Sequence, residues 1–292
     1  MERWAGRLRF ISRARATARD RKSRPSTVIR RPSPVSAPGF EATVDRGALR
    51  GAQILFLCLP DGDVVEDALF GDEGVSSLLA PDAIVVDLST IEHAKTLAIA
   101  ERLAAGGRLF LDAPVSGAPP GAEAGALTVM CGGDAATFKA VRPLLERFSA
   151  TVLHMGPVGS GQLTKTINNT IYDINIAALA EVMPMAVAMG LDPDKLATVV
   201  TTGSSRSFAA DYFVPRILKG KFDEGYPVGK AYKDLASCAA VATQHMIPMP
   251  LTAAMMAIYQ TTIRQGHGDL DKGAMILSYE DLLGIRVRTG GA

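Results

Sequence analysis

Short apolar runs alternate with helical patterns from residue 53 to about residue 155. Each run is almost continuously apolar, which is typical of strands buried on both faces of a parallel sheet. We predict strands at 54–59, 83–88, 109–112, 127–131 and 151–154. Helical patterns fall between them, most clearly at 64–69, 92–105 and 138–148. This alternation predicts an α/β fold with a doubly wound parallel sheet.

The pattern changes after Gly156, where the strands stop and the following segments have helical spacing. The longest apolar stretch, 171–191, is interrupted by Asp173, Asn175 and Glu181, so we expect a core helix and not a membrane span. That stretch belongs to a predicted helix over 163–189. Further helices are predicted at 191–200, 207–218, 228–245, 251–265 and 270–283. We therefore expect a sheet domain over 27–158 and an all-helical domain over 159–292.

The first 26 residues form an atypical, arginine-rich segment. A doubly wound dinucleotide-binding domain normally opens with an apolar strand and a G-x-G-x-x-G turn, whose backbone N–H groups hold a pyrophosphate. Here residues 1–25 contain only Gly6, and residues 26–31 read as a strand that ends in Arg30 and Arg31. The run Leu8–Ile11 could at best form a short substitute strand. We therefore expect a sheet whose first strand and glycine turn are degenerate.

Three origins fit this arginine-rich segment: a mitochondrial transit peptide, a natural divergent arm, or the product of a shifted reading frame or misassigned start. We favour the third, because a transit peptide would precede an intact first strand and would not replace it. Reading the upstream coding DNA in the other frames would test this interpretation.

Charge is concentrated in the same segment. Residues 1–31 hold 11 of the 31 Lys and Arg and only 2 of the 30 Asp and Glu, which leaves the rest of the chain mildly acidic. Nucleic-acid binding by the body of the chain is therefore not expected. The three cysteines are widely separated and the four histidines lack metal-ligand spacing, so we expect no metal site and a reducing compartment. We expect a cytoplasmic location, with the mitochondrial matrix as the alternative.

Three motifs carry candidate chemistry. In Gly156–Asn169 a glycine-rich turn leads into a helix on which Lys165 and Asn169, four residues apart, share one face. A lysine can donate a proton to a developing alkoxide while an amide orients a polar substrate. The second motif, 112–118, reads Asp-Ala-Pro-Val-Ser-Gly-Ala, and the third, 85–90, reads Val-Val-Asp-Leu-Ser-Thr. The second and third motifs each lie at the end of a predicted buried strand, 109–112 and 83–88 respectively.

Together these motifs resemble those of the β-hydroxyacid dehydrogenases, in the same order and spacing, from about Thr27 to Leu283. The resemblance implies a Rossmann-type NAD(P)-binding domain followed by a helical substrate and dimerisation domain. It implies hydride transfer between NADP or NAD and a small 3-hydroxy acid or the corresponding semialdehyde or oxo acid. Lys165 matches the catalytic proton donor and acceptor of that family. A homodimer or homotetramer is also implied, with no nucleic-acid or membrane partner.

The resemblance further assigns residues to the substrate and to the cofactor. Matches to substrate-binding positions are Ser116, Gly117, Asn169, Tyr226 and Asp234. Matches to cofactor-lining positions are Leu59, Pro60, Thr90 and Lys233. Arg30 and Arg31 stand at the end of the predicted second strand, where arginine accommodates the 2′-phosphate of NADP and an acidic residue would hold the ribose of NAD. We therefore expect a preference for NADP.

Two departures limit the resemblance. Lys165 is followed by Asn168 and Asn169, whereas 6-phosphogluconate dehydrogenase has Lys-x-x-His-Asn, so that substrate is not expected. Ala118 replaces the usual second glycine after the serine. The missing glycine fingerprint leaves a second hypothesis open, in which the chain is catalytically impaired and acts only as a helical dimer or assembly module. Because this fingerprint is missing, we also expect the chain as written to bind NAD(P) weakly or not at all.

Overall fold

The computed structural model describes residues 8–12 and 45–290, and the structural statements below concern those residues. The chain divides into two compact units, Met1–Lys165 and Thr166–Ala292.

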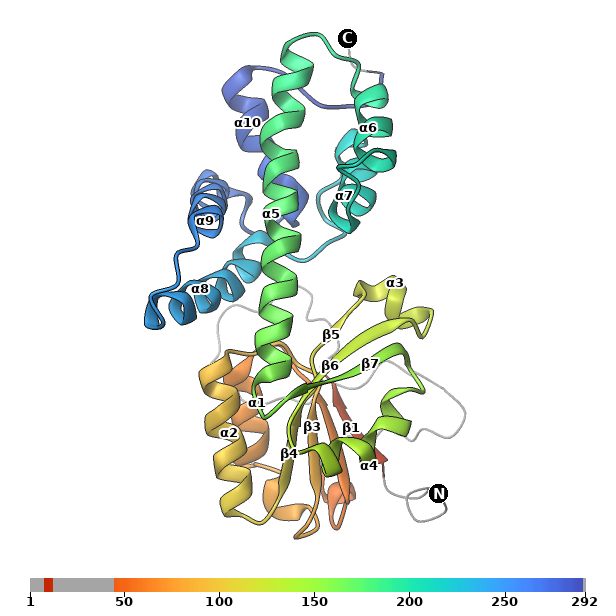
Figure 1. Ribbon diagram of the computed structural model, residues 1–292, viewed down its shortest axis with the longest axis vertical. Helices are drawn as coiled ribbons and strands as arrows, with labels where there is room; N and C mark the ends of the chain where they lie inside the picture. The colour runs from red at the N-terminus through yellow and green to blue at the C-terminus, as the bar shows by residue number, and fades with distance from the viewer. Residues whose placement is uncertain (1–7, 13–44, 291–292) are drawn as a thin grey trace. The chain divides into compact units, whose positions relative to one another are not determined.

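The first unit contains the sheet (Figure 1). Strands β1 to β4 are parallel and adjacent in chain order, β6 runs antiparallel to β4 and β5, and β7 runs parallel to β6. Their bounds are Leu8–Ser12 (β1), Ile54–Cys58 (β2), Ile84–Asp87 (β3), Leu109–Asp112 (β4), Val115–Ser116 (β5), Leu127–Gly132 (β6) and Ser149–Gly156 (β7).

The expected Rossmann-type sheet followed by helices is confirmed, with one departure in strand direction. We predicted a parallel sheet throughout, but β6 pairs antiparallel with β4 and β5. The connection between Asp112 and Leu127 holds only β5 and the six-residue helix α3, Ala118–Glu123. A parallel return needs a crossover that is usually a full covering helix, whereas an antiparallel return needs only a short connection. The chain therefore turns back along β4 and β5.

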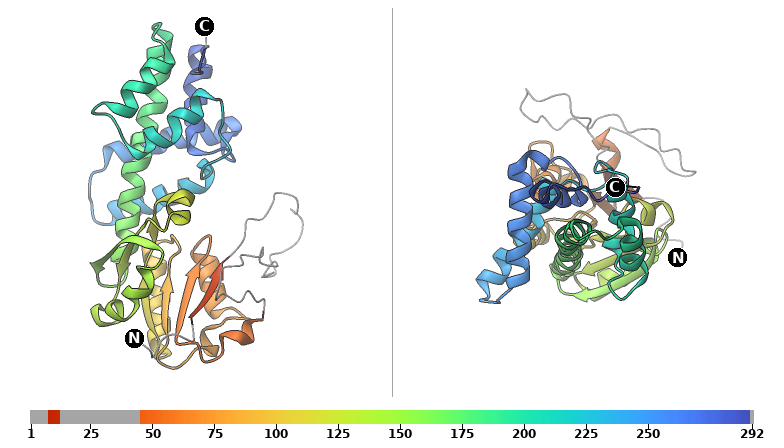
Figure 2. Two further views of the ribbon diagram at one scale, coloured as in Figure 1. Left: turned by 90° about the vertical axis from the view of Figure 1, so that its right-hand side faces the viewer. Right: turned by 90° about the horizontal axis from the view of Figure 1, so that it is seen from above.

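The segment Leu8–Ser12 forms the substitute strand that the sequence suggested. It pairs with β2 in parallel over five residues, from Leu8 opposite Ile54 to Ser12 opposite Cys58 (Figures 1 and 2). Strand β2 therefore has a neighbour on each side, because β3 pairs with its other edge. The strand predicted at 26–31, with Arg30 and Arg31, lies outside the described residues.

Alternate residues of the central strands face opposite helical layers. Leu55 and Leu57 pack with helices α1, Gly62–Phe70, and α2, His93–Ala105. Ile54 and Phe56 pack instead with helix α4, Ala135–Leu145. Because successive side chains of a strand point to opposite faces, a strand buried on both faces must be apolar throughout. This explains the continuous apolar runs of the sequence.

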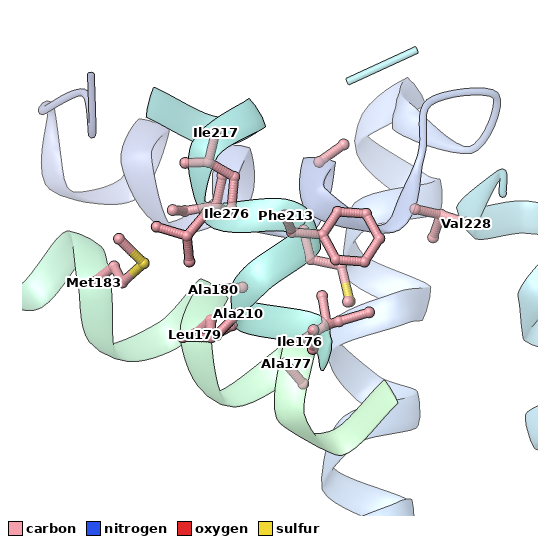
Figure 3. Packing of buried hydrophobic residues seen from close by; sticks show 14 of the residues in the cluster. Ile176, Ala177, Leu179, Ala180, Met183, Ala210, Phe213, Ile217, Val228 and Ile276 are labelled. Atoms are coloured by element: carbon pink, nitrogen blue, oxygen red, sulfur yellow. The ribbon is translucent and has the colours of Figure 1, made fainter. Parts of the chain in front are cut away.

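The second unit is helical, as expected. Its helices are α5, Ser160–Ala188, which begins in the first unit, and then α6, Pro193–Thr202, α7, Phe208–Leu218, α8, Val228–Gln244, α9, Pro250–Thr262, and α10, Met275–Leu283. Buried side chains from these helices form one core, shown in Figure 3, in which Met183 of α5, Phe213 of α7 and Ile276 of α10 take part. Shorter helical segments are Ile263–His267 and Lys272–Ala274 in this unit, and Arg46–Leu49 and Ser76–Leu78 in the first unit.

Helix α5 is long and apolar enough, by length and composition, to cross a membrane, and among the described residues it is the one helix of which this holds. A core helix meets the same criteria. Ile176, Ala180 and Met183 lie in the core of the helical unit. The same helix carries a buried carboxylate, Asp173, which forms an ion pair with Lys272. These contacts account for part of the apolar composition of α5, whereas other apolar side chains of this helix, such as Ile171 and Met185, are exposed.

Candidate active site

The first turn of α5 is fixed to the end of β4 by the carboxylate of Asp112. Its Oδ1 accepts the backbone N–H of Gly159 at 2.7 Å, and its Oδ2 accepts that of Gln162 at 2.8 Å. The carboxylate thus caps backbone N–H groups that a helix start leaves without partners. A Cβ at Gly161 would collide with the carbonyl oxygen of Met130, so only glycine allows this close approach.

A second set of hydrogen bonds connects the same turn to the loops that follow β2 and β3. The Gln162 side chain donates from Nε2 to the carbonyl of Ser89 at 2.7 Å and accepts the N–H of Ile91 through Oε1 at 3.2 Å. The Ser89 hydroxyl accepts the N–H of Leu59 at 2.8 Å. Gln162 is fully buried and Ser89 nearly so. Three loops at the carboxyl edge of β2, β3 and β4 therefore share one buried polar network with α5.

Two carboxylates lie side by side beneath this network, because Asp87 and Asp112 are register partners in β3 and β4. Burial raises the pKa of Asp87 to about 6, the Asp112 charge adds to that rise, and hydrogen bonds from Ser89 oppose it. Burial also raises the pKa of Asp112, although backbone N–H groups of Gly159 and Gln162 stabilise its charged form. Burial and the Asp112 charge raise the pKa of the nearby Cys131 thiol to about 12, so this thiol is protonated at neutral pH.

The predicted carboxylate-binding segment lies in the hairpin beyond β4. Ser116 ends β5 and is half-buried, and Gly117 is the N-cap of α3 with φ of 134°. A Cβ at Gly117 would also meet the Leu127 side chain at 3.0 Å, which explains the glycine. Ala118 has a φ of 56°, in the left-handed region that favours glycine. The departure noted in the sequence therefore places an alanine in a strained conformation.

The predicted cofactor-lining residues of the first unit differ in accessibility. The side chain of Leu59 is buried in the core under α1, whereas Pro60 is exposed and Thr90 is half-buried. Any contact of Leu59 with a cofactor would therefore come from its backbone. Arg30 and Arg31 lie outside the described residues.

The predicted site residues of the helical unit are partly brought together. Asn169 of α5 donates from Nδ2 to Oδ2 of Asp234 on α8 at 3.4 Å. Lys233, the neighbour of Asp234, is half-buried, and Tyr226 is exposed in the segment before α8. Within α5, Lys165 and Asn169 are one helical turn apart, as the sequence predicted. The structure thus pairs an amide and a carboxylate one turn beyond the lysine.

Sequence reasoning did not single out Gln162 or Ser89. Gln162 lies inside the lysine motif Gly156–Asn169, three residues before Lys165, so a polar residue directly after Gly161 was the available signal. Its partners Ser89 and Ile91 lie more than 70 residues away in the chain, and no pattern indicates such pairings. Among the residues that the structure describes, no group of three or more potential metal ligands occurs.

Family models match both parts of the chain. A model described as the NAD binding domain of 6-phosphogluconate dehydrogenase matches residues 33–156. A model described as "NAD-binding of NADP-dependent 3-hydroxyisobutyrate dehydrogenase" matches residues 159–279. The 2-(hydroxymethyl)glutarate dehydrogenase of Eubacterium barkeri is 32% identical over 258 residues, 88% of this chain and 86% of its own length. The chain belongs to the β-hydroxyacid dehydrogenase family.

Solved structures agree with this membership. A 3-hydroxyisobutyrate dehydrogenase from Salmonella typhimurium superposes with a TM-score of 0.73 at 30% identity, over 77% of this chain and 79% of that one. The protein Psf3 in complex with NADP+ and 2-OPP gives 0.72 at 29% identity, over 80% of this chain and 83% of that one. The predicted enzyme class, an NAD(P)-dependent hydroxyacid dehydrogenase, and its NAD(P) cofactor are confirmed.

Proposed function

We propose that this chain transfers a hydride between NADP(H) and a small 3-hydroxy acid or its semialdehyde or oxo acid, with Lys165 as the proton donor and acceptor. One observation carries the proposal. Lys165 follows Gln162 by three residues on α5, and Gln162 is hydrogen-bonded to the carboxyl ends of β3 and β4. In doubly wound sheets, ligands bind outside the carboxyl ends of the strands.

The described residues suit the nicotinamide half of the cofactor. Pro60 and Thr90 reach the surface of the carboxyl edge, while their neighbours Leu59 and Ser89 are buried and fixed by a hydrogen bond. This gives a rigid edge against which a flat ring can lie. When bound, the nicotinamide ring supplies or accepts the hydride.

The protein's own residues then handle the proton and the substrate. In the reducing direction, the Nζ–H of Lys165 protonates the carbonyl oxygen as the carbon receives the hydride, so no free alkoxide forms. The Ser116 hydroxyl and the backbone around Gly117 donate hydrogen bonds to the substrate carboxylate. Asn169, which is hydrogen-bonded to Asp234, matches the family's substrate-orienting position. In the oxidising direction, neutral Lys165 accepts the hydroxyl proton.

Replacement of the lysine tests this assignment. We expect Lys165→Ala to lower kcat by about 100-fold or more, the effect of losing a general acid, with an unchanged unfolding midpoint. Lys219→Ala is the matched control, because Lys219 is an exposed lysine at the C-terminal end of α7. The substrate panel consists of short 3-hydroxy acids and semialdehydes. Near-normal turnover of Lys165→Ala would exclude Lys165 as the proton donor.

The preference for NADP is part of the proposal and is supported by Arg30 and Arg31 in the sequence. Initial rates with NADPH and NADH, each at subsaturating concentration, give the ratio of the two kcat/KM values. We expect a ratio above 1 that falls when both arginines are replaced by alanine. A clear preference for NADH in the parent chain would refute the assignment of these arginines.

We further propose that the helical unit forms dimers. Val182 and Met185 are exposed large apolar side chains on one face of α5, and Met189, also exposed, follows directly after the end of this helix. Exposed contiguous apolar surface commonly marks a protein interface. Light scattering after size exclusion tests the proposal: a dimer is expected, and Met185→Glu should weaken it, whereas a strictly monomeric parent would contradict it. The cytoplasmic location and the domain boundary at 158/159 stay predictions.

The alternative is an impaired family member that retains only its assembly role. The absence of a glycine fingerprint before β2 in the sequence favours it. The two functions differ in one measurable property, since only the enzyme oxidises or reduces the nicotinamide. A dimer without turnover on the whole substrate panel would favour the alternative.

A further inference from the structure

We propose that Gln162 is a positioning residue, which sets the place of Lys165 relative to the cofactor-lining loops. This inference rests on the proposed function of Lys165. Gln162 makes three hydrogen bonds to two segments: its N–H to Asp112 at the end of β4, and its Nε2 and Oε1 to the Ser89 carbonyl and the Ile91 N–H in the loop after β3. All of its hydrogen-bonding partners lie at the carboxyl edge of β3 and β4.

Because Gln162 and Lys165 lie on the same helix, α5, the position of Gln162 also fixes the position of the lysine backbone. Residues three apart on a helix are neighbours on its surface, so Lys165 stands next to Gln162 within the same helical turn. A helix is stiff over one turn, and the rotation of α5 about its axis therefore decides where the lysine side chain starts. The Gln162 amide fixes that rotation, because it bonds the loop after β3 from both its oxygen and its nitrogen.

The same network reaches the cofactor side of the reaction. The Ser89 residue whose carbonyl accepts from Gln162 also accepts the Leu59 N–H through its hydroxyl, and Leu59 precedes Pro60. Thr90 lies between the two Gln162 partners, Ser89 and Ile91. One side chain thus connects the proton donor to both loops that are expected to line the nicotinamide.

The network is more specific than core packing requires. Gln162 is fully buried, and an apolar residue of the same size would fill its volume but leave the Ser89 carbonyl and the Ile91 N–H without this partner. A buried amide whose oxygen and nitrogen both have partners favours one arrangement of the loop and the helix. Displacement of reacting groups by about 1 Å can cost about 100-fold in rate. We therefore expect loss of the amide to lower kcat, in addition to the stability cost of the two backbone groups that lose their partner.

The test compares Gln162→Met with Ser149→Ala. Ser149 is also buried and loses one hydrogen bond, to the Leu145 carbonyl, but it starts β7, whereas Gly156 at the other end of β7 leads to α5. We expect Gln162→Met to lower kcat at least about 10-fold and to increase the primary isotope effect measured with NADPH deuterated at the transferred position. KM for the substrate should change less than threefold. Ser149→Ala should change stability alone.

A second variant, Gln162→Glu, tests the positioning role even if Gln162→Met does not fold. Gln162→Glu keeps an acceptor for the Ile91 N–H, and its protonated form regains a donor for the Ser89 carbonyl. Burial raises the pKa of a carboxyl group, so the kcat of Gln162→Glu relative to the parent should increase as pH falls from 8 to 5.5. A kcat ratio independent of pH, or a Gln162→Met kcat equal to that of the parent, would overturn the positioning role.

The two proposals fail in different ways. A parent chain without turnover on the substrate panel would refute the proposed function and the positioning role with it. An active parent whose Lys165→Ala variant is inactive, but whose Gln162 variants are normal, would refute the positioning role alone.

Discussion

The protonation of Asp87 should control part of the stability of the sheet unit. Asp87 is fully buried at the end of β3, and its Oδ1 accepts the Ser89 N–H at 2.9 Å. Its Oδ2 has no hydrogen-bond partner among the described residues. Burial is the largest cause that raises the pKa of this carboxyl from its ordinary 3.8 to about 6. The folded protein therefore binds this proton more tightly than the unfolded chain does.

The sign and size of the effect follow from linkage. Because the folded-state pKa is the higher one, the stabilisation is complete below about pH 3.8 and is lost as pH rises through about 6. One pKa unit corresponds to about 1.4 kcal/mol, so a rise from 3.8 to about 6 amounts to about 3 kcal/mol. Above about pH 7, the buried charge reduces the free energy of unfolding by that amount relative to a protonated carboxyl.

Asp87→Asn removes the titration, because an amide stays neutral. We expect the free energy of unfolding of Asp87→Asn minus that of the parent to increase by about 2 kcal/mol between pH 4 and 7.5, because part of the effect falls below pH 4; it is measured by urea unfolding at 25 °C. The comparison across pH cancels any constant cost of the amide.

Asp134→Asn is the matched control. Asp134 is an exposed N-cap of α4, and the N–H of Thr137 that it accepts lowers its pKa. Its titration therefore ends below this pH window, and its difference from the parent should stay constant. A constant difference for Asp87→Asn as well would refute the account of a destabilising buried charge.

Two further stability predictions come from single contacts and are measured by the same urea unfolding. Lys272→Met leaves the Asp173 carboxylate buried without its ion-pair partner and should lower the free energy of unfolding by about 3–5 kcal/mol. The double variant Lys272→Met/Asp173→Asn should recover most of that loss. Equal losses in the single and the double variant would contradict the prediction. Ala118→Gly should increase the free energy of unfolding by about 0.5–1 kcal/mol. The left-handed backbone costs alanine about 1–2 kcal/mol, and the greater flexibility of glycine in the unfolded chain offsets part of the relief. A loss of stability would show that the alanine side chain packs favourably.

The sequence predicted the elements whose burial is uniform. The strand Ile84–Asp87 is buried along its whole length, so its residues are apolar up to Asp87. This apolar run can be recognised in the sequence without knowing which strands lie beside it. Helix α2 was visible for the complementary reason, since only its side chains toward the sheet, such as Ile99 and Leu103, are buried. In both cases, the local pattern of apolar residues reflects which side chains are buried.

The hairpin that carries Ser116 was not predicted as structure. Its helix, α3, contains Pro119 and Pro120 and begins at a glycine, a composition that is typical of loops. Prolines near a helix start need no N–H partner, so the helix forms nevertheless. The antiparallel direction of β6 was missed for a related reason: apolar runs show burial but not the direction in which a strand enters the sheet.

Contacts between distant residues were also beyond the sequence. The lysine motif was recognised because its residues are neighbours on one helix, but the Gln162 hydrogen bonds join positions more than 70 residues apart. The ion pair of Asp173 with Lys272 joins residues 99 apart. A single polar residue in a helical pattern fits a solvated face equally well, and only the fold decides between the two.

Binding of NADPH to the chain as it stands is the remaining prediction. In this fold, the pyrophosphate is held by backbone N–H groups of the glycine turn after the first strand. Strand β1, Leu8–Ser12, lies beside β2, so the sheet has a neighbour where a first strand belongs. The residues that follow Ser12 in the sequence contain no glycine until Gly39, and therefore no G-x-G-x-x-G turn.

Strand β1 does not replace the glycine turn, because its backbone pairs with β2, whereas the cofactor phosphates need backbone N–H donors that are not already bonded. Losing even two hydrogen bonds to charged phosphate, at about 1.5–3 kcal/mol each, lowers affinity by about 100-fold or more. We therefore expect NADPH to bind weakly in isothermal titration, so that turnover needs a high cofactor concentration, or, on the assembly-only alternative, not to bind at all. In either case, we expect the helical domain to fold and dimerise. A dissociation constant in the micromolar range would show that the segment after β1 rebuilds the phosphate site by other donors, and it would remove the main support for the impaired, assembly-only alternative.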